Sequence, residues 1–135
     1  MTDYLLDTNH ASKLMAQEEP IASQVREAQA AGDRFGFSVT VLGELYYAVY
    51  ASQYRQRNLY RLRHLLEALL LWPFDEAAAE EFGRIQAEQK AKGRPIPPLD
   101  AQIAAVARVY GLTLLTADRH FQFMDDLTTE NWLGA

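Results

Sequence analysis

Short apolar runs that lead to acidic residues constrain the fold of this chain most strongly. The run at residues 4–6 ends at Asp7, and the run at residues 112–115 leads to Asp118. Continuous apolar runs of this length are typical of strands that are covered on both faces. Because segments with helical patterns lie between these runs, the sequence predicts an α/β fold with a central, mainly parallel sheet.

The expected elements alternate between strands and helices. We expect strands at residues 4–6, 35–39 and 112–115, a short extended piece at 71–74, and a last edge segment at 127–132. We expect helices from a cap at Thr8 or Asn9 to about Ala31, and at residues 40–55, 56–70, 75–92 and 99–110. Gly111 would end the last helix, whose inward side chains are expected to be Ile103, Val106, Ala107 and Tyr110.

Length and composition favour one domain and exclude several kinds of site. The chain has 135 residues, a common size for a single domain, so we expect residues 1–135 to form one. It has no cysteine, which excludes disulfides and thiolate zinc sites and fits a cytoplasmic location. Signal-peptide and membrane-spanning patterns are not found. The net charge of −5 is unusual for a nucleic-acid-binding protein unless bound cations offset some of the acids.

Four acidic residues are the candidate functional residues. They are Asp7, Glu44, Asp100 and Asp118. Asp7 and Asp118 follow strands, and functional sites of parallel sheets lie beyond the carboxyl ends of the strands. Glu44 and Asp100 each lie near the start of a helix. Carboxylates gathered without cysteines or paired histidines suit a hard cation such as Mg²⁺ or Mn²⁺, and such cations are common in phosphodiester cleavage.

Taken singly, three of these acids also have a structural interpretation. Asp7, Asp100 and Asp118 could each cap the N-terminus of a helix. Glu44 has no Ser or Thr three residues before it, so it does not belong to a capping box. Two like charges ~5 Å apart repel by roughly 3 kcal/mol at an effective dielectric near 20. Four acids in one pocket would therefore hold protons or a cation, and we favour the cation.

The order and spacing of these motifs resemble those of PIN-domain ribonucleases, most closely the VapC-type toxins of toxin–antitoxin pairs. The resemblance covers almost the whole chain. It rests on residues 6–9 (LDTN), 42–45 (LGEL), 100–105 (DAQIAA) and 115–121 (LTADRHF), with a similar approach at 93–97 (GRPIP). His10 stands where many members carry an apolar residue, and His120 stands where some carry another acid.

The resemblance implies a three-layer α/β/α domain that binds one or two Mg²⁺ or Mn²⁺ ions. The metal-binding and catalytic acids of the family match Asp7, Glu44, Asp100 and Asp118, and the polar residues beside them match Thr8, Asn9 and Thr116. The metals would polarise the scissile phosphate of RNA, and in-line attack would leave a 5′-phosphate and a 3′-hydroxyl. The resemblance also implies a homodimer and an antitoxin that places an arginine or lysine near the acids.

Basic and aromatic residues are candidates for further contacts. Lys92 and Arg94 approach Asp100 along the chain, and we expect them to contact RNA phosphates. The tyrosines at positions 46, 47, 50 and 54 have helical spacing, which favours core or dimer contacts over base stacking. We expect the three histidines to be structural or on the surface.

Three other functions use similar acids. A response-regulator receiver domain needs adjacent acids after the first strand and a lysine after the last, but Asp7 stands alone and residues 116–121 contain no lysine. A metal-dependent phosphatase would use the same acids on a small substrate. A PIN-like module that only binds partners would not need all four acids.

Overall fold

The computed structural model describes residues 1–134 and contains a parallel sheet of five strands. The strands are β1 (Asp3–Leu6), β2 (Arg34–Ser38), β3 (Leu70–Trp72), β4 (Thr113–Leu115) and β5 (Thr129–Glu130). They lie in the order β3-β2-β1-β4-β5, and every neighbouring pair is parallel. The predicted parallel sheet is confirmed. A receiver domain is excluded by this order, because receivers have the order 2-1-3-4-5.

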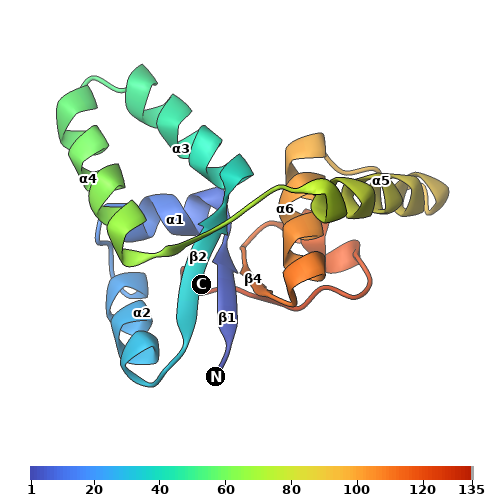
Figure 1. The fold of residues 1–135 in the computed structure, drawn as a ribbon, viewed down its shortest axis with the longest axis horizontal. Coiled ribbons are helices and arrows are strands. Elements are labelled where there is room, and N and C mark those ends of the chain that lie inside the picture. The colour runs from blue at the N-terminus through green and yellow to red at the C-terminus, as the bar shows by residue number, and fades with distance from the viewer. Residues whose placement is uncertain (135) are drawn as a thin grey trace.

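Helices cover both faces of the sheet. They are α1 (Thr8–Met15), α2 (Ile21–Ala30), α3 (Val39–Ala51), α4 (Arg55–Ala68), α5 (Glu76–Ala91) and α6 (Pro98–Tyr110), with a 3₁₀ turn η1 at Arg119–Phe123. Figure 1 shows α1, α2 and α4 on one side of the sheet and α5 and α6 on the other. The predicted α/β/α arrangement is confirmed. Within residues 1–134, no helix has the length and apolar character needed to cross a membrane.

The prediction of one helix from about Thr8 to Ala31 is wrong, because two helices occupy this region. The chain leaves the helical path after α1, and Gln17 adopts a left-handed φ of 57°. Pro20 then follows, which has no N–H to donate and disfavours a helical conformation in the preceding residue. The cap of α1 is also one residue earlier than expected, because Asp7 accepts the hydrogen bond from the helix N-terminus.

The core lies where the central strands meet the helices. Leu5, Leu6, Leu114 and Leu115 on β1 and β4 are completely buried, as expected for strands covered on both faces. The pairing of strand β2 with strand β3 requires a glycine at position 36, because a Cβ atom there would lie 2.3 Å from a backbone oxygen of β3. This close approach lets a three-residue strand form the edge of the sheet.

Four tyrosines differ from the expected burial. Tyr47, Tyr50 and Tyr54 are more than half exposed, so a core position is wrong for them and a dimer contact stays a prediction. Tyr110 was expected to face inward from α6 but is 37% exposed. Its hydroxyl donates a hydrogen bond to Asp75 at the start of α5, which gives the polar end of the side chain a partner at the surface.

Hydrogen bonds beyond the strand ends bring three chain segments together. The backbone N–H of Asp7 donates to Leu115 O at 3.0 Å, which continues the pairing of β1 with β4. The N–H of Thr116 donates to Glu130 O at 2.8 Å, which continues the pairing of β4 with β5. Residues that follow β1 and β4 therefore lie at the same edge of the sheet, as carboxyl ends of parallel strands must.

Candidate active site

The four predicted acids lie in one pocket at the carboxyl edge of the sheet. The pocket has a volume of about 360 Å³. Its lining consists of Asp7, Thr8, Asn9, Glu44, Asp100, Ile103, Ala117, Asp118 and Phe121. Four separate segments of the chain thus contribute carboxylates to a single cavity that is open to solvent, and none of the lining residues is basic.

Asp7 has a structural role as well as a place in the pocket. It is 8% exposed and caps α1. Its Oδ1 accepts the backbone N–H of His10 at 2.8 Å and lies 2.9 Å from His10 Nδ1. The structural interpretation of Asp7 as a helix cap is therefore confirmed, but the cap uses only Oδ1. Among residues 1–134, no group donates a hydrogen bond to Oδ2.

Glu44 reaches the pocket from α3 and has a polar partner there. Thr8 donates its hydroxyl hydrogen to Glu44 Oε1, with an oxygen–oxygen distance of 2.5 Å. This partner comes from α1, 36 positions away, so sequence inspection did not find it. The threonine hydroxyl donates this hydrogen bond but carries no charge. Thr8 therefore orients Glu44 without neutralising its charge.

Asp100 and Asp118 meet across His120. His120 Nδ1 lies 3.1 Å from Asp100 Oδ2 and 3.2 Å from Asp118 Oδ1. Burial raises the pKa of Asp100, the hydrogen bond from His120 lowers it, and the charges of Asp118 and Asp7 raise it further, with a net upward shift. The pocket thus disfavours the charged form of Asp100, as expected where like charges gather.

The two predicted cap roles at Asp100 and Asp118 have different outcomes. Asp118 accepts the backbone N–H of His120 at 2.9 Å and so caps η1. Asp100 instead lies in the first turn of α6, whose cap position is Pro97. Thr116 lies beneath the pocket and is buried, and its Oγ1 accepts the N–H of Asp118 at 3.0 Å. Thr116 therefore supports Asp118 from behind.

The predicted RNA-contacting residues lie outside this pocket. Lys92 donates to Asp125 Oδ2 at 2.8 Å, and the guanidinium of Arg94 lies 4.2 Å from the centre of the Phe123 ring. Lys92 thus contacts the segment after η1, and Arg94 contacts η1 itself, the turn that carries His120. Their contact with RNA stays a prediction.

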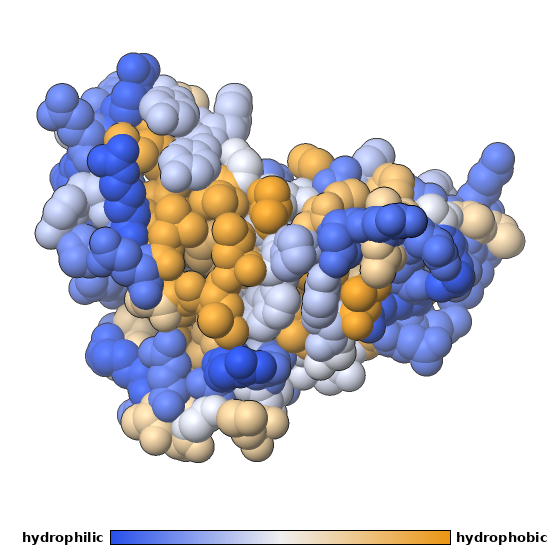
Figure 2. Space-filling view, viewed as in Figure 1, coloured by the Kyte–Doolittle hydropathy of each residue, from blue (hydrophilic) through white to orange (hydrophobic). Residues whose placement is uncertain are grey.

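A second cavity, of about 740 Å³, lies between helices α1, α2 and α4. Apolar side chains at its surface include Leu14, Met15, Leu65 and Leu69. A further apolar area covers the segment from α4 to α5 (Figure 2), which includes Leu70 (40% exposed) and Leu71 (46%). Apolar surface of this kind marks sites of contact with other proteins.

Comparison with protein families supplies the observation that decides the classification. The family model described as the PIN domain matches residues 4–127. This chain belongs to the PIN-domain family. The match includes the segments that carry all four acids, and the resemblance found in the sequence motifs is thereby confirmed.

Relatives over the whole chain are VapC proteins. The chain is 36% identical to the "Ribonuclease VapC2" of Haemophilus influenzae over 98% of its own length and 100% of that protein. It is 34% identical to the "tRNA(fMet)-specific endonuclease VapC" of Shigella flexneri, over 98% of this chain and 99% of the other. This PIN domain is therefore of the VapC type.

Solved structures of VapBC complexes have the same fold. The VapBC2 structure from Rickettsia felis, bound to a DNA fragment from the promoter, matches with a TM-score of 0.90 at 27% identity, over 97% of this chain and 99% of that one. The DNA-bound VapBC structure from Salmonella typhimurium matches with a TM-score of 0.89 at 30% identity, over 98% and 99%. The agreement covers the whole PIN domain.

The donor atoms of this PIN domain fit a divalent cation. Ligand atoms of Asp100, Asp118 and His120 lie within 4.8 Å of one another. Carboxylate oxygens dominate the pocket, and this donor set suits Mg²⁺ or Mn²⁺ better than a soft metal. Burial and, to a lesser extent, the charges of Asp118 and Asp7 raise the pKa of Asp100, and a bound cation would offset both effects.

Two histidines contact the acids, although the sequence predicted no such contact for them. His120 is exposed, as expected, and it also lies between two of the acids. His10 is structural as expected, yet its ring contacts Asp7. In both cases the spacing offered a signal, because His10 is three residues after one acid and His120 is two residues after another. A histidine so close to an acid at the start of a helix can fold back onto it.

Proposed function

We propose that this PIN-domain protein is a metal-dependent endoribonuclease and the toxin of a toxin–antitoxin pair. The observation that carries the proposal is the convergence of Asp7, Glu44, Asp100 and Asp118 in one pocket lined by no basic residue. The names of the full-length relatives, which are a ribonuclease and a tRNA endonuclease, support RNA as the substrate.

The cofactor that we propose is Mg²⁺ or Mn²⁺, as one ion or two, held by Asp7, Glu44, Asp100 and Asp118. Such an ion would supply positive charge to the scissile phosphate and lower the pKa of attacking water. His120 is a further nitrogen donor in reach of the same position. The four acids are the catalytic residues of this proposal because they hold the reacting groups in place.

Residues around the acids fix their positions before RNA binds. Thr8 donates to Glu44 Oε1, and Thr116 accepts the N–H of Asp118. Asn9 is exposed at the pocket lining and is available to contact the substrate. A site whose charged groups are held in advance needs little rearrangement when negative charge develops on the phosphate.

We propose that RNA runs past the end of α5 and that Lys92 and Arg94 contact its phosphates. Both are exposed and follow α5; Lys92 contacts Asp125 just after η1, and Arg94 contacts Phe123 at the end of η1. Phosphate contacts from such residues would add affinity without sequence preference. They would also offset the net charge of −5, which otherwise repels RNA.

We infer an antitoxin partner, a homodimer and a cytoplasmic location. The solved relatives are VapBC complexes, and the apolar cavity between α1, α2 and α4 is a surface on which an amphipathic segment could dock. A basic side chain of that partner would fit the acidic pocket. The exposed Tyr47, Tyr50 and Tyr54 provide apolar area for a second copy of the chain.

The proposal is tested by cleavage of RNA with purified protein free of antitoxin. Total RNA and tRNA(fMet) are incubated with Mg²⁺, with Mn²⁺ or with EDTA. An Asp7→Asn variant is compared with Asp3→Asn, because Asp3 lies at the opposite end of the same strand and pairs with Arg34 at the surface. We expect cleavage that needs the metal, is lost in Asp7→Asn and is retained in Asp3→Asn.

Products and binding separate the remaining outcomes. Fragments with 5′-phosphate and 3′-hydroxyl ends support the proposed reaction. Cleavage that persists in EDTA, or in Asp7→Asn, would overturn it. Release of phosphate from small esters without RNA cleavage would favour a phosphatase, and RNA or protein binding without any hydrolysis would favour a binding module.

A further inference from the structure

His10 lies fully buried behind Asp7, and both of its ring nitrogens have partners. Nδ1 lies 2.9 Å from Asp7 Oδ1, and Nε2 accepts the backbone N–H of Trp132 at 3.1 Å. His10 does not line the acidic pocket. Any effect of this ring on a substrate or a cation must therefore pass through Asp7.

The N–H of Trp132 decides which ring nitrogen of His10 carries the hydrogen. A backbone N–H can only donate, so Nε2 must accept and carries no hydrogen itself. The ring hydrogen then lies on Nδ1, where it is donated to Asp7 Oδ1. The tautomer of His10 is thus set by a residue 122 positions later in the chain.

Asp7 Oδ1 therefore receives two hydrogen bonds from one residue. The backbone N–H of His10 lies 2.8 Å away and its Nδ1 lies 2.9 Å away. Two donors on one oxygen fix the plane of the carboxylate. Hydrogen-bonded partners of this kind orient metal-binding side chains, and their loss typically lowers metal affinity by 10- to 100-fold.

The segment that contains Trp132 is itself held by the sheet. The ring of Trp132 packs on Tyr4 and Phe35, with ring-centroid distances of 5.0 and 5.4 Å. Its Nε1 donates to Glu130 Oε1 at 2.9 Å, and Glu130 belongs to β5. The segment whose N–H donates to His10 is therefore held by the same strands that position the acids.

We propose that His10 is a positioning residue for the metal site. Its Nδ1–H, fixed by the N–H of Trp132, holds Asp7 Oδ1 and leaves Oδ2 free to bind a divalent cation. The inference rests on the proposed function, because Asp7 binds a cation only if the pocket does. Its first half, the tautomer, concerns the metal-free protein alone.

The tautomer is tested by NMR on the unaltered protein without metal. Long-range ¹H–¹⁵N correlations distinguish a ring with its hydrogen on Nδ1 from one with its hydrogen on Nε2, and a His10→Asn variant assigns the signals. We expect the Nδ1–H form. A ring with hydrogen on Nε2 would overturn the inference, because such a ring could not accept from Trp132.

Variants at position 10 test the link to the metal. His10→Leu removes the donor and keeps an apolar side chain of similar size, whereas His10→Asn keeps an N–H near the position of Nδ1. His64→Leu is the control, because His64 packs on Tyr60 in α4. Mn²⁺ affinity, measured by calorimetry, should fall about 10-fold in His10→Leu, recover largely in His10→Asn and stay unchanged in His64→Leu.

The outcomes separate this inference from the proposed function. If the unaltered protein binds no Mn²⁺, the proposed metal site fails, and the tautomer still stands or falls by NMR. If the unaltered protein binds Mn²⁺ and His10→Leu binds it equally well, only the positioning role is overturned. A loss of thermal stability in both His10 variants with unchanged Mn²⁺ affinity would show a purely structural residue.

Discussion

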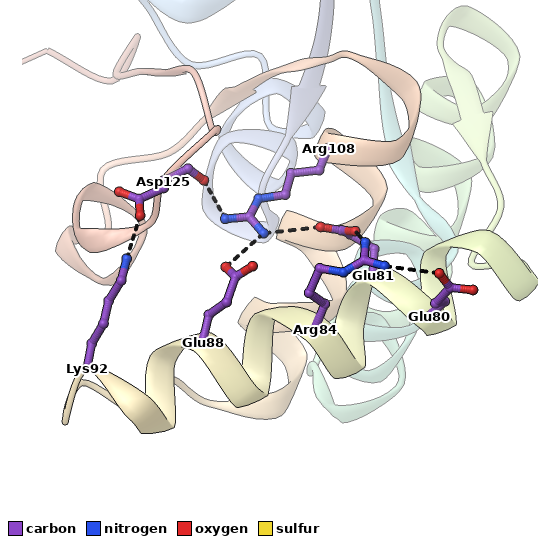
Figure 3. A network of polar contacts seen from close by, with 7 residues as sticks. All are labelled: Glu80, Glu81, Arg84, Glu88, Lys92, Arg108 and Asp125. Carbon is purple, nitrogen blue, oxygen red and sulfur yellow. Dashed lines mark hydrogen bonds and ion pairs between the residues drawn. The ribbon is translucent and has the colours of Figure 1, made fainter.

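Two clusters of acidic side chains in this molecule differ in what neutralises them. The α5–α6 cluster contains Glu80, Glu81, Arg84, Glu88, Lys92, Arg108 and Asp125 (Figure 3). There Arg108 lies 3.1 Å from Glu81 and 3.2 Å from Glu88, and Lys92 pairs with Asp125. In the acidic pocket, by contrast, the ion pairs found within residues 1–134 go only to His10 and His120.

The pKa values of Asp125 and Asp100, one aspartate from each cluster, shift in opposite directions. The hydrogen bond and charge of Lys92 lower the pKa of Asp125, whereas burial and the neighbouring acids raise the pKa of Asp100. One cluster is therefore balanced by its own chain and holds two helices together. The acidic pocket keeps an excess of negative charge, which lowers the stability of the fold. Such a cost is expected at a functional site.

The largest effect is expected on cleavage. Asp118→Asn keeps an oxygen that can cap η1 but removes the charge of a proposed metal ligand, so RNA cleavage should fall by about 10³-fold, roughly 4 kcal/mol of transition-state stabilisation. Initial rates at fixed Mg²⁺ measure this. The matched change in the other cluster, Glu80→Gln on the exposed face of α5, should leave the rate unchanged. Equal losses of cleavage rate in Asp118→Asn and Glu80→Gln would contradict the proposed difference between the two clusters.

The next effect is on stability. The Arg108 side chain is 91% buried. It forms ion pairs with Glu81 and Glu88 and donates a hydrogen bond to the backbone carbonyl of Asp125. Arg108→Met would leave Glu88 and the Asp125 carbonyl without this partner and would leave Glu81 with Arg84 alone. We therefore expect a loss of about 3 kcal/mol in the free energy of unfolding. Urea denaturation measures it. Arg26→Met, which removes the exposed pair with Glu19, is the control and should show no measurable change.

A smaller effect of opposite sign is expected at Asp100. Its folded pKa is raised, so its protonated form is favoured and stability falls as the pH rises from about 3.8 through the raised value. Asp100→Asn removes this penalty, and its melting temperature without metal at pH 7 should exceed that of the unaltered protein by roughly 2–5 °C. The difference should shrink as the pH is lowered towards 4. A variant that melts lower than the unaltered protein at pH 7 would contradict this sign.

The smallest effect is expected at Lys92. Lys92→Met would remove one phosphate contact, weaken RNA binding a few-fold for all sequences and reduce the slope of log affinity against log salt by about 1. Binding to catalytically inactive Asp118→Asn protein across a salt series measures this. Lys13→Met is the control, because Lys13 lies on α1 beside Glu18. An unchanged salt slope would show that Lys92 pairs with Asp125 but does not contact RNA phosphates.

The sheet and the meeting of the acids were predictable because they follow from local patterns and one rule of topology. The apolar runs before Asp7 and Asp118 identify buried strands, and parallel strands place their carboxyl ends together. Glu44 and Asp100 were less constrained by this rule, since both lie on helices. Their positions were expected mainly from the resemblance to PIN domains.

Contacts between distant residues were not predictable in the same way. The bond from Thr8 to Glu44 and the bond from Trp132 to His10 join segments 36 and 122 positions apart. No periodic pattern encodes such pairs, because they depend on how helices and strands settle in three dimensions. The break between α1 and α2 is different, because Pro20 is a local signal for the end of a helix. The helical pattern before and after Pro20 nevertheless favoured one continuous helix.

The strand order has a consequence for synthesis on the ribosome. β1 is made first, yet its neighbours in the sheet are β2 and β4, and β4 ends at residue 115. Asp7 and Glu44 therefore leave the ribosome long before Asp100 and Asp118. The backbone oxygen of Glu130, which holds the end of β4, comes later still. An enzyme proposed to cut RNA thus completes the support of its cutting site only after residue 130 has been synthesised.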